Sequence, residues 1–258
     1  MRRGWLGLLW ALMPVLVMAQ GSMSRIPTRT GVTTAVFWAT AQAATQTVVL
    51  FPGGGGGFGQ VVDGWPSSNN FLVRSGRGFL AQGMNVAIFG RASDLPAEGY
   101  QSGDRITASH MEDVSAVLAW VRARSNAPIW LIGTSMGTIS ATAAAISFPD
   151  QVAGMVLTSS IVNVRRPGAV PAQDLAKVRV PTLVVHHRHD ACAICYPTDV
   201  PLIMNGLTQA PVRQLKWVEG GSEPSGNPCE ALHYHGFIGV EASTVDLMAK
   251  WIRQPTGD

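Results

Sequence analysis

The chain has 258 residues, of which 47% are hydrophobic and only 14% are charged, proportions that exclude a disordered or fibrous protein and fit a large hydrophobic core. Its 19 Lys and Arg residues against 16 Asp and Glu residues give a formal charge of +3, and no basic stripe or acidic block is present. The sequence therefore offers no electrostatic basis for nucleic-acid binding.

The first residues have the pattern of a secretory signal peptide over residues 1–19. Two arginines open the chain, an apolar run follows over residues 5–17, and small residues suit cleavage before Gln20. A membrane anchor is the weaker alternative, because the run contains Pro14 and is shorter than the roughly 20 residues of a spanning helix. We therefore expect an exported protein, periplasmic or secreted, whose mature part (20–258) forms a single domain without a stable membrane anchor.

Beyond this segment, predicted strands and helices alternate. Short apolar runs bounded by Gly or Pro predict buried strands, and apolar residues at three- and four-residue spacing predict amphipathic helices. This order predicts an α/β fold, a mostly parallel sheet with helices on both faces. Only about 20 residues separate the strand predicted at 154–158 from the strand at 182–186, too few for a separate cap domain over the site, so we expect a minimal cap. The predicted elements are possible edge strands near 31–38, strands at 47–51, 85–89, 129–132, 154–158, 182–186 and 213–218, and helices at 71–82, 109–124, 139–147 and 237–253.

A candidate nucleophile lies between the strand at 129–132 and the helix at 139–147. Gly133, Ser135 and Gly137 fit the Gly-x-Ser-x-Gly elbow, in which a tight strand-to-helix turn exposes the serine hydroxyl. A side chain at either glycine position would collide with the crowded turn. The flanking strand and helix supply the context that this motif requires, so we predict that Ser135 is a nucleophile.

A serine nucleophile needs a histidine base and a carboxylate that fixes the tautomer of the histidine. Asp190 follows the strand at 182–186, and His235 follows the last strand and precedes the last helix, in the chain order expected after the elbow. Asp199 is the competing acid, although it begins a helix, where a carboxylate is stabilising. His233 is the competing base. We favour Asp190 and His235.

Acyl transfer also needs hydrogen-bond donors for the oxyanion. The first expected donor is the amide of Met136, directly after the nucleophile. The glycine run 53–57 follows the strand at 47–51, and residues without side chains let their amides turn toward a substrate oxygen. The second donor is therefore expected from Gly54 or Gly55.

The same glycines also allow a cofactor-binding interpretation. Gly54, Gly56 and Gly59 have the spacing of a dinucleotide-binding loop. The residues that follow do not read as a helix able to hold a pyrophosphate, and the next strand ends without an acidic residue for the ribose. An NAD(P)-dependent oxidoreductase is thus a weaker alternative, and we expect no cofactor.

Histidines and cysteines near the candidate acid allow two further interpretations. His186, His187 and His189 with Asp190 could form a metal cluster, but neighbouring strand positions face opposite sides and no second ligand set is evident. The pair Cys192 and Cys195 has redox-motif spacing, but not at a helix N-terminus near the start of the chain. We expect no metal.

The elbow, the glycine loop, Asp190 and the segment from His235 to Phe237 resemble the α/β-hydrolase superfamily over nearly the whole chain after residue 19. The resemblance implies the α/β-hydrolase fold and a covalent acyl-serine intermediate, but no particular substrate. The sequence departs from a common pattern in one place, since Pro52 occupies the position before the glycines where many relatives have His.

Three cysteines remain in the exported part, so one disulfide and one free thiol are expected. Cys192 follows the predicted acid and Cys229 precedes the predicted base, so the two sulfurs meet if both loops meet at the site. We predict a Cys192–Cys229 disulfide, worth roughly 4 kcal/mol by loop entropy. A Cys195–Cys229 bond is the alternative.

These observations favour a serine hydrolase that cleaves an ester, or less favourably an amide or thioester, in a small acyl substrate. An NAD(P)-dependent oxidoreductase and a hydrolase-like binding protein without catalysis are the alternatives. The second needs additional assumptions, because all three triad positions are filled.

Overall fold

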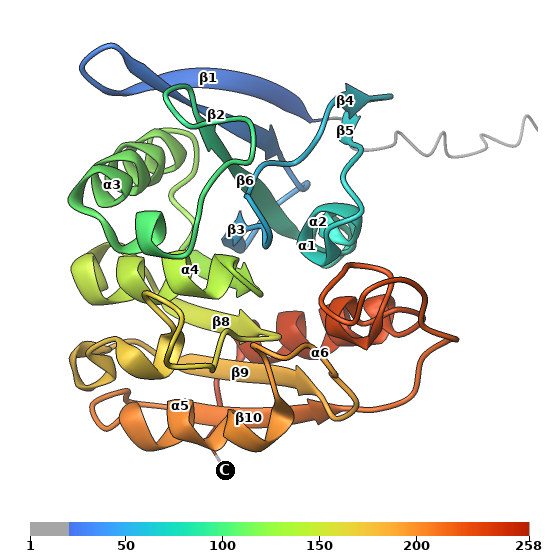
Figure 1. Cartoon of the computed structure of the whole chain (residues 1–258). Helices are drawn as coiled ribbons and strands as arrows, with labels where there is room; N and C mark the ends of the chain where they lie inside the picture. The colour runs from blue at the N-terminus through green and yellow to red at the C-terminus, as the bar shows by residue number, and fades with distance from the viewer. Residues whose placement is uncertain (1–20, 258) are drawn as a thin grey trace, which may run out of the picture.

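The computed structural model describes residues 21–257, which contain an eight-stranded sheet in the order β1-β2-β6-β3-β7-β8-β9-β10 (Figure 1). β1 and β2 pair antiparallel, β2 and β6 also pair antiparallel, and every pair from β6 to β10 is parallel. The predicted mostly parallel sheet is therefore confirmed. The strands are β1 (Ser22–Arg29), β2 (Val32–Ala39), β3 (Gln46–Phe51), β6 (Met84–Ala92), β7 (Ile129–Thr134), β8 (Gly154–Thr158), β9 (Thr182–His187) and β10 (Arg213–Val218).

Helices cover both faces of the sheet (Figure 1). One hydrophobic cluster joins α3, α4 and α5 to one face, and the other joins α1, α2 and α6 to the opposite face. Alternation along β3 supplies both clusters, since Val48 belongs to one and Val49 to the other. The helices are α1 (Phe71–Arg74), α2 (Gly76–Ala81), α3 (Ala108–Arg122), α4 (Gly137–Ser147), α5 (Pro201–Gly206) and α6 (Glu241–Arg253).

The helices predicted at 109–124 and 139–147 agree with α3 and α4 to within two residues at each end, whereas the other two differ more from the structure. The helix predicted at 71–82 is divided into α1 and α2 at Ser75, which lies between them as the C-cap of one and the N-cap of the other. The helix predicted at 237–253 begins only at Glu241, because Phe237 has a left-handed φ of 58° that an α-helix does not accept. The backbone before α6 instead forms the 3₁₀ helix η6 (Tyr234–Gly236).

The connection between β8 and β9 contains only two short 3₁₀ helices, η3 (Val170–Ala172) and η4 (Leu175–Lys177). The carboxyl ends of the parallel strands are therefore covered by loops and not by an inserted helical cap. None of the helices within residues 21–257 has the length and apolar character needed to cross a bilayer. The predicted signal peptide, residues 1–19, lies outside the described residues.

Candidate active site

Ser135 lies in a tight turn between the end of β7 and the start of α4. It has a φ of 52°, a strained value for a residue with a side chain. A Cβ on Gly133 would lie 2.6 Å from the Gly137 oxygen, and a Cβ on Gly137 would lie 1.9 Å from the Phe51 oxygen. Only glycine fits at these two positions, so the two glycines allow the turn that exposes Ser135.

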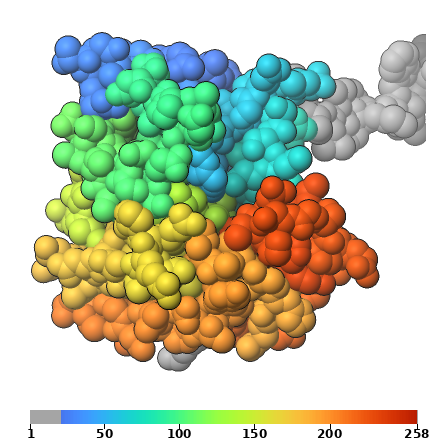
Figure 2. Space-filling model, viewed as in Figure 1, coloured from blue at the N-terminus to red at the C-terminus, as the bar shows by residue number. Residues whose placement is uncertain are grey.

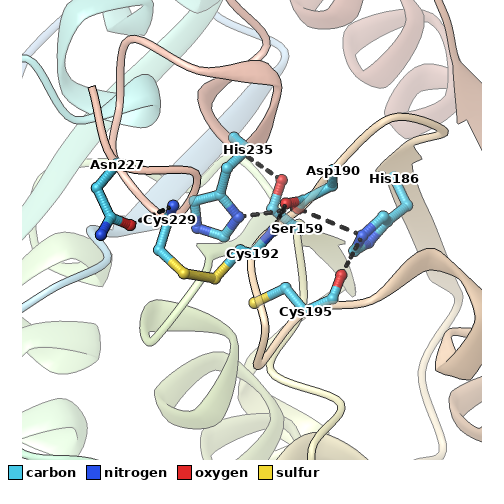
Figure 3. Close-up of a disulfide and its surroundings, with 8 residues drawn as sticks. All are labelled: Ser159, His186, Asp190, Cys192, Cys195, Asn227, Cys229 and His235. Carbon is cyan, nitrogen blue, oxygen red and sulfur yellow. Dashed lines mark hydrogen bonds and ion pairs between the residues drawn. A yellow bond between two sulfur atoms is a disulfide. The ribbon is translucent and has the colours of Figure 1, made fainter. Parts of the chain in front are cut away.

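His235 and Asp190 come together beside this turn. His235 belongs to η6 and its Nδ1 lies 2.8 Å from Oδ2 of Asp190, which follows β9 (Figure 3). The second carboxylate oxygen of Asp190 accepts a hydrogen bond from the Cys192 amide at 2.9 Å. The Nε2 atom of His235 is buried and has no hydrogen-bond partner among residues 21–257. One ring nitrogen is thus held by a carboxylate and the other remains available for a proton.

His186, at the end of β9, is a second partner of Asp190 that the sequence analysis does not assign. Its Nε2 lies 3.4 Å from Asp190 Oδ2 and 2.9 Å from the carbonyl oxygen of Cys195 (Figure 3). Burial alone would raise the pKa of Asp190. The hydrogen bonds from His186 and His235 lower it by more than burial raises it, so the pKa falls from 3.8 to about 2. Asp190 is therefore ionised at neutral pH although it is buried.

The competing acid and base do not join this arrangement. Asp199 lies in the 3₁₀ helix η5 (Pro197–Asp199), and its side chain receives a hydrogen bond from the neighbouring Thr198 at 3.3 Å. His233 precedes η6, and its ring packs edge-to-face on Tyr234. No hydrogen bond or ion pair within residues 21–257 joins His233 to Asp190.

Ser135 and His235 line the same pocket, which has a volume of about 220 Å³. Larger hollows of about 490 Å³ lie beside the glycine loop and between α2 and α6, but neither is lined by Ser135 or His235. We therefore identify the candidate site by the residues that line it and not by its volume. The remaining lining residues are Gly53, Gly54, Asn70, Phe71, Thr134, Cys229, Glu230, Ala231 and Gly236.

The pocket forms where the C-terminal loop meets the segment around α1. Figure 2 shows the red C-terminal segment directly beside the cyan residues that include α1 and α2. Arg74 on α1 joins the two segments, because its guanidinium donates to the Gly236 oxygen at 2.6 Å and pairs with Glu241 at 2.9 Å. This contact holds the loop of His235 against α1.

The glycine loop forms a β-turn at the rim of the pocket. The amide of Gly56 donates to the oxygen of Gly53 at 3.1 Å, and Gly54 has a φ of 56°, which glycine adopts without steric cost. A Cβ on Gly54 would meet open space, whereas a Cβ on Gly55 would lie 1.9 Å from the Glu98 oxygen. Of the two predicted oxyanion glycines, Gly54 lines the pocket and Gly55 packs against the segment behind it.

The predicted first donor, the Met136 amide, follows Ser135 in the turn. Within residues 21–257, no carbonyl or side-chain acceptor takes a hydrogen bond from this amide or from those of Gly54 and Gly55. An amide without an acceptor at a pocket is free to bind a ligand oxygen. Of the three residues, Gly54 lines the pocket, Met136 directly follows the pocket-lining Ser135, and the Gly55 amide belongs to the peptide that begins at Gly54.

A family model described as the alpha/beta hydrolase fold matches residues 46–187. The chain belongs to the α/β-hydrolase family. This membership supports a hydrolase activity. No curated protein matches the sequence.

Solved structures show the same fold. An alpha-beta serine hydrolase homologue from Coxiella burnetii is 20% identical, with a TM-score of 0.62 over 90% of this chain and 97% of its own. An esterase from Pyrococcus furiosus is 14% identical, with a TM-score of 0.65 over 96% of this chain and 97% of its own. A serine hydrolase without lid from Xanthomonas campestris is 17% identical, with a TM-score of 0.59 over 96% of this chain and 100% of its own. At these identities the likeness is one of fold.

In this α/β-hydrolase, the residues after the glycine loop do not form the helix that a dinucleotide site requires. Gly59 is followed by the small hairpin of β4 (Val61–Val62) and β5 (Trp65–Pro66), and α1 begins only at Phe71. The loop therefore does not lead directly into a helix, as it does where a helix N-terminus binds a pyrophosphate. The geometry does not support the NAD(P) alternative.

The α/β-hydrolase chain contains a disulfide between Cys192 and Cys229, the pairing that the sequence analysis favours (Figure 3). Cys195 is a free and buried thiol, and burial raises its pKa. Cys192, Cys195 and His235 place ligand atoms within 4.8 Å of one another, but the Cys192 sulfur is part of the disulfide and cannot act as a thiolate. These residues do not suit a metal ion.

The alternative histidine cluster is also separated by the fold. His186 faces Asp190 and Cys195, whereas the His187 ring contacts the Gly220 oxygen at 3.0 Å and stacks on Tyr234. Adjacent strand residues thus point to opposite faces, as the pleat requires.

Proposed function

We propose that this α/β-hydrolase is a serine esterase that works through an acyl-Ser135 intermediate, with His235 as base and Asp190 as the acid that orients it. The observation that carries the proposal is a strained, pocket-lining Ser135 beside a His235 whose Nδ1 is bound to a buried, ionised Asp190. A serine hydroxyl becomes a strong nucleophile only when such a base removes its proton.

In the acylation step, His235 Nε2 takes the Ser135 proton while the hydroxyl oxygen attacks the ester carbonyl carbon. The carbonyl π electrons move to the oxygen, which accepts hydrogen bonds from Met136 and from Gly54 or Gly55. The ester C–O bond then breaks, and the leaving alkoxide takes the proton from His235. The products of this step are the alcohol and acyl-Ser135.

Deacylation repeats the sequence with water as the nucleophile. His235 removes a proton from water, the hydroxide oxygen bonds to the acyl carbon, and the bond to Ser135 breaks as Ser135 recovers the proton. Asp190 stabilises the imidazolium formed in both steps, because a carboxylate whose pKa is about 2 stays charged throughout. The cycle uses only residues of the chain and consumes no cofactor.

The pocket supports a small and neutral acyl group. Its volume is about 220 Å³, and no inserted cap covers it within the described residues. Glu230 is the only Asp, Glu, Lys or Arg residue among those that line the pocket, and it is exposed. We therefore expect short-chain esters to be cleaved in preference to long-chain lipids, and esters in preference to amides or thioesters.

We also propose that residues 1–19 direct export to the periplasm or outside the cell, and that residues 20–258 act as one catalytic domain. A disulfide between Cys192 and Cys229 suits an oxidising compartment. The intact mass of the protein purified from an exporting host tests this, since cleavage before Gln20 removes residues 1–19.

The deciding experiment is labelling of the mature protein with a fluorophosphonate, followed by peptide mapping, with Ser135→Ala as the control. We expect one adduct on Ser135, none on the variant, and parallel loss of p-nitrophenyl acetate hydrolysis. Absence of an adduct on the folded wild-type protein would overturn the proposal and favour a hydrolase-like binding protein.

A further inference from the structure

Arg105 is a buried cation without a carboxylate partner. It lies in the 3₁₀ helix η1 (Gly103–Ile106), and only 2% of its surface is exposed. Among residues 21–257 no Asp or Glu oxygen lies within 4.0 Å of its guanidinium. Burying an unpaired charge is costly, so a buried arginine of this kind needs a specific role.

The guanidinium is directed at the glycine loop. Its Nη2 donates to the oxygen of Gly54 at 2.8 Å, its Nη1 donates to Ser140 Oγ at 3.1 Å, and it lies over the Tyr100 ring at 5.3 Å. Burial lowers the pKa of Arg105 to about 10, which still leaves it charged at neutral pH. The Gly54 carbonyl thus receives a charge-assisted hydrogen bond, the stronger kind.

The neighbours of Arg105 hold it in this position. His110 on α3 lies 2.9 Å from Ser140 Oγ, and burial followed by the charge of Arg105 lowers its pKa to about 3. A neutral imidazole can accept the Ser140 hydrogen, which leaves the Ser140 oxygen free to accept from Arg105. The three side chains therefore form one buried chain of hydrogen bonds that ends at the glycine loop.

The Gly54 oxygen belongs to the central peptide of the Gly53–Gly56 turn. The hydrogen bond of the turn joins Gly56 to Gly53 and leaves the peptide between Gly54 and Gly55 unconstrained. In a trans peptide the carbonyl and the following amide point in opposite directions, so the Gly55 amide faces away from Arg105. If this peptide flipped, the Gly54 oxygen, a hydrogen-bond acceptor, would take the place of the Gly55 amide, a donor, on the face opposite Arg105.

We propose that Arg105 is a positioning residue that fixes this peptide and thereby keeps the oxyanion turn in its donating orientation. The inference rests on the proposed function, because it assigns Arg105 to the stabilisation of the oxyanion on the acyl carbon. The bond to Gly54 also polarises the peptide, which strengthens the Gly55 amide as a donor. Arg105 acts through the turn and does not contact the substrate.

The test compares Arg105→Met with the wild-type protein in p-nitrophenyl acetate hydrolysis and in binding of a trifluoromethyl ketone. Ser135 adds to this ketone and forms an oxyanion, so its affinity reports on the oxyanion site. We expect kcat to fall about 10- to 100-fold with KM nearly unchanged, less than the loss of a whole oxyanion donor. The ketone affinity should fall by the same factor.

Arg105→Lys is the conservative variant, because it keeps the charge and one donor but loses the planar fork. We expect its kcat to lie between those of the wild type and Arg105→Met. Arg29→Met is the matched control. Arg29, at the end of β1, pairs with Asp113 on α3 and with Asp94 after β6, so its loss should lower thermal stability without a change in ketone affinity relative to wild type.

The outcomes separate this proposal from the proposed function. If the wild-type protein is not labelled on Ser135 by the fluorophosphonate, the proposed function fails first. If wild type is labelled and Arg105→Met retains wild-type kcat and ketone affinity, the role of Arg105 is refuted. If Arg105→Met does not fold, the folded Arg105→Lys variant decides between the outcomes. A ketone affinity equal to that of the wild type refutes the proposal, and a weaker ketone affinity with an unchanged KM supports it.

Discussion

Removal of the Cys192–Cys229 disulfide should destabilise the protein and disturb the candidate site together. The bond closes a loop with a sequence separation of 37, and the loop-entropy relation for that length gives about 4 kcal/mol of stabilisation at 25 °C. For a chain of this size, such a loss corresponds to a fall in Tm of roughly 10 °C. The perturbation is the double variant Cys192→Ala/Cys229→Ala.

The same variant should also lose activity. Cys192 lies shortly after Asp190, and its amide donates to that carboxylate at 2.9 Å, while Cys229 lies shortly before His235 and lines the pocket. The disulfide therefore joins the loops of the proposed acid and base. A small displacement of such groups is costly to catalysis, so we expect kcat to fall at least roughly tenfold with little change in KM.

Thermal unfolding followed by circular dichroism measures the first effect, and hydrolysis of p-nitrophenyl acetate well below the Tm measures the second. Cys195→Ala is the matched control, because Cys195 is buried beside the disulfide but is not part of it. It should cost only about 1 kcal/mol through lost packing. A double variant whose Tm and kcat equal those of Cys195→Ala would refute the reasoning.

Three other predictions concern the acid, the elbow and the framework. Asp190→Asn should lower kcat by roughly 10⁴-fold while the fold is retained, as measured by steady-state kinetics and circular dichroism. Because the pKa of Asp190 is lowered from 3.8 to about 2, its ionised form stabilises the protein fully above about pH 4, and this stabilisation is lost as the pH falls toward 2. In urea unfolding between pH 2 and pH 5, the free energy of unfolding of Asp190→Asn should therefore depend less on pH than that of the wild type. Thr107→Ala removes the N-cap that accepts from the His110 amide, so it should lower the free energy of unfolding, measured in urea, by about 1 kcal/mol. Gly137→Ala places a Cβ 1.9 Å from the Phe51 oxygen and should prevent correct folding, which circular dichroism would show.

The order of strands and the position of the elbow follow from local sequence signals. The strands at β3, β7 and β9 are short apolar runs that end at Pro, Gly or polar residues, and their limits agree closely with the prediction. Helix limits were less predictable. The late start of α6 depends on the left-handed φ of Phe237, whereas Ser75 keeps a right-handed conformation at the break between α1 and α2, and the apolar spacing continues across both positions.

The site residues outside the elbow illustrate what sequence alone leaves open. Asp190 and His235 are separated by η5, α5, β10 and a long loop, but their places after strands of a parallel sheet indicate that they meet at its carboxyl edge. His186 was missed as a partner of Asp190, because the sequence does not show that the loop after β9 turns back on the strand. Arg105 was missed because its burial depends on contacts with Gly54 and Ser140, which lie far from it in the chain.

The absence of an inserted cap within the described residues explains why so many fixed contacts converge on the proposed base. Enzymes with lids can assemble their catalytic groups when the substrate closes the site, but an open pocket must hold them in advance. Here Ser159 Oγ donates to the His235 oxygen at 2.7 Å, and Asp190 binds the ring itself at 2.8 Å (Figure 3). Arg74 donates to the oxygen of the next residue, Gly236, at 2.6 Å. The histidine is thus fixed from three different segments of the chain, and loosening any one of them should affect turnover more than substrate binding.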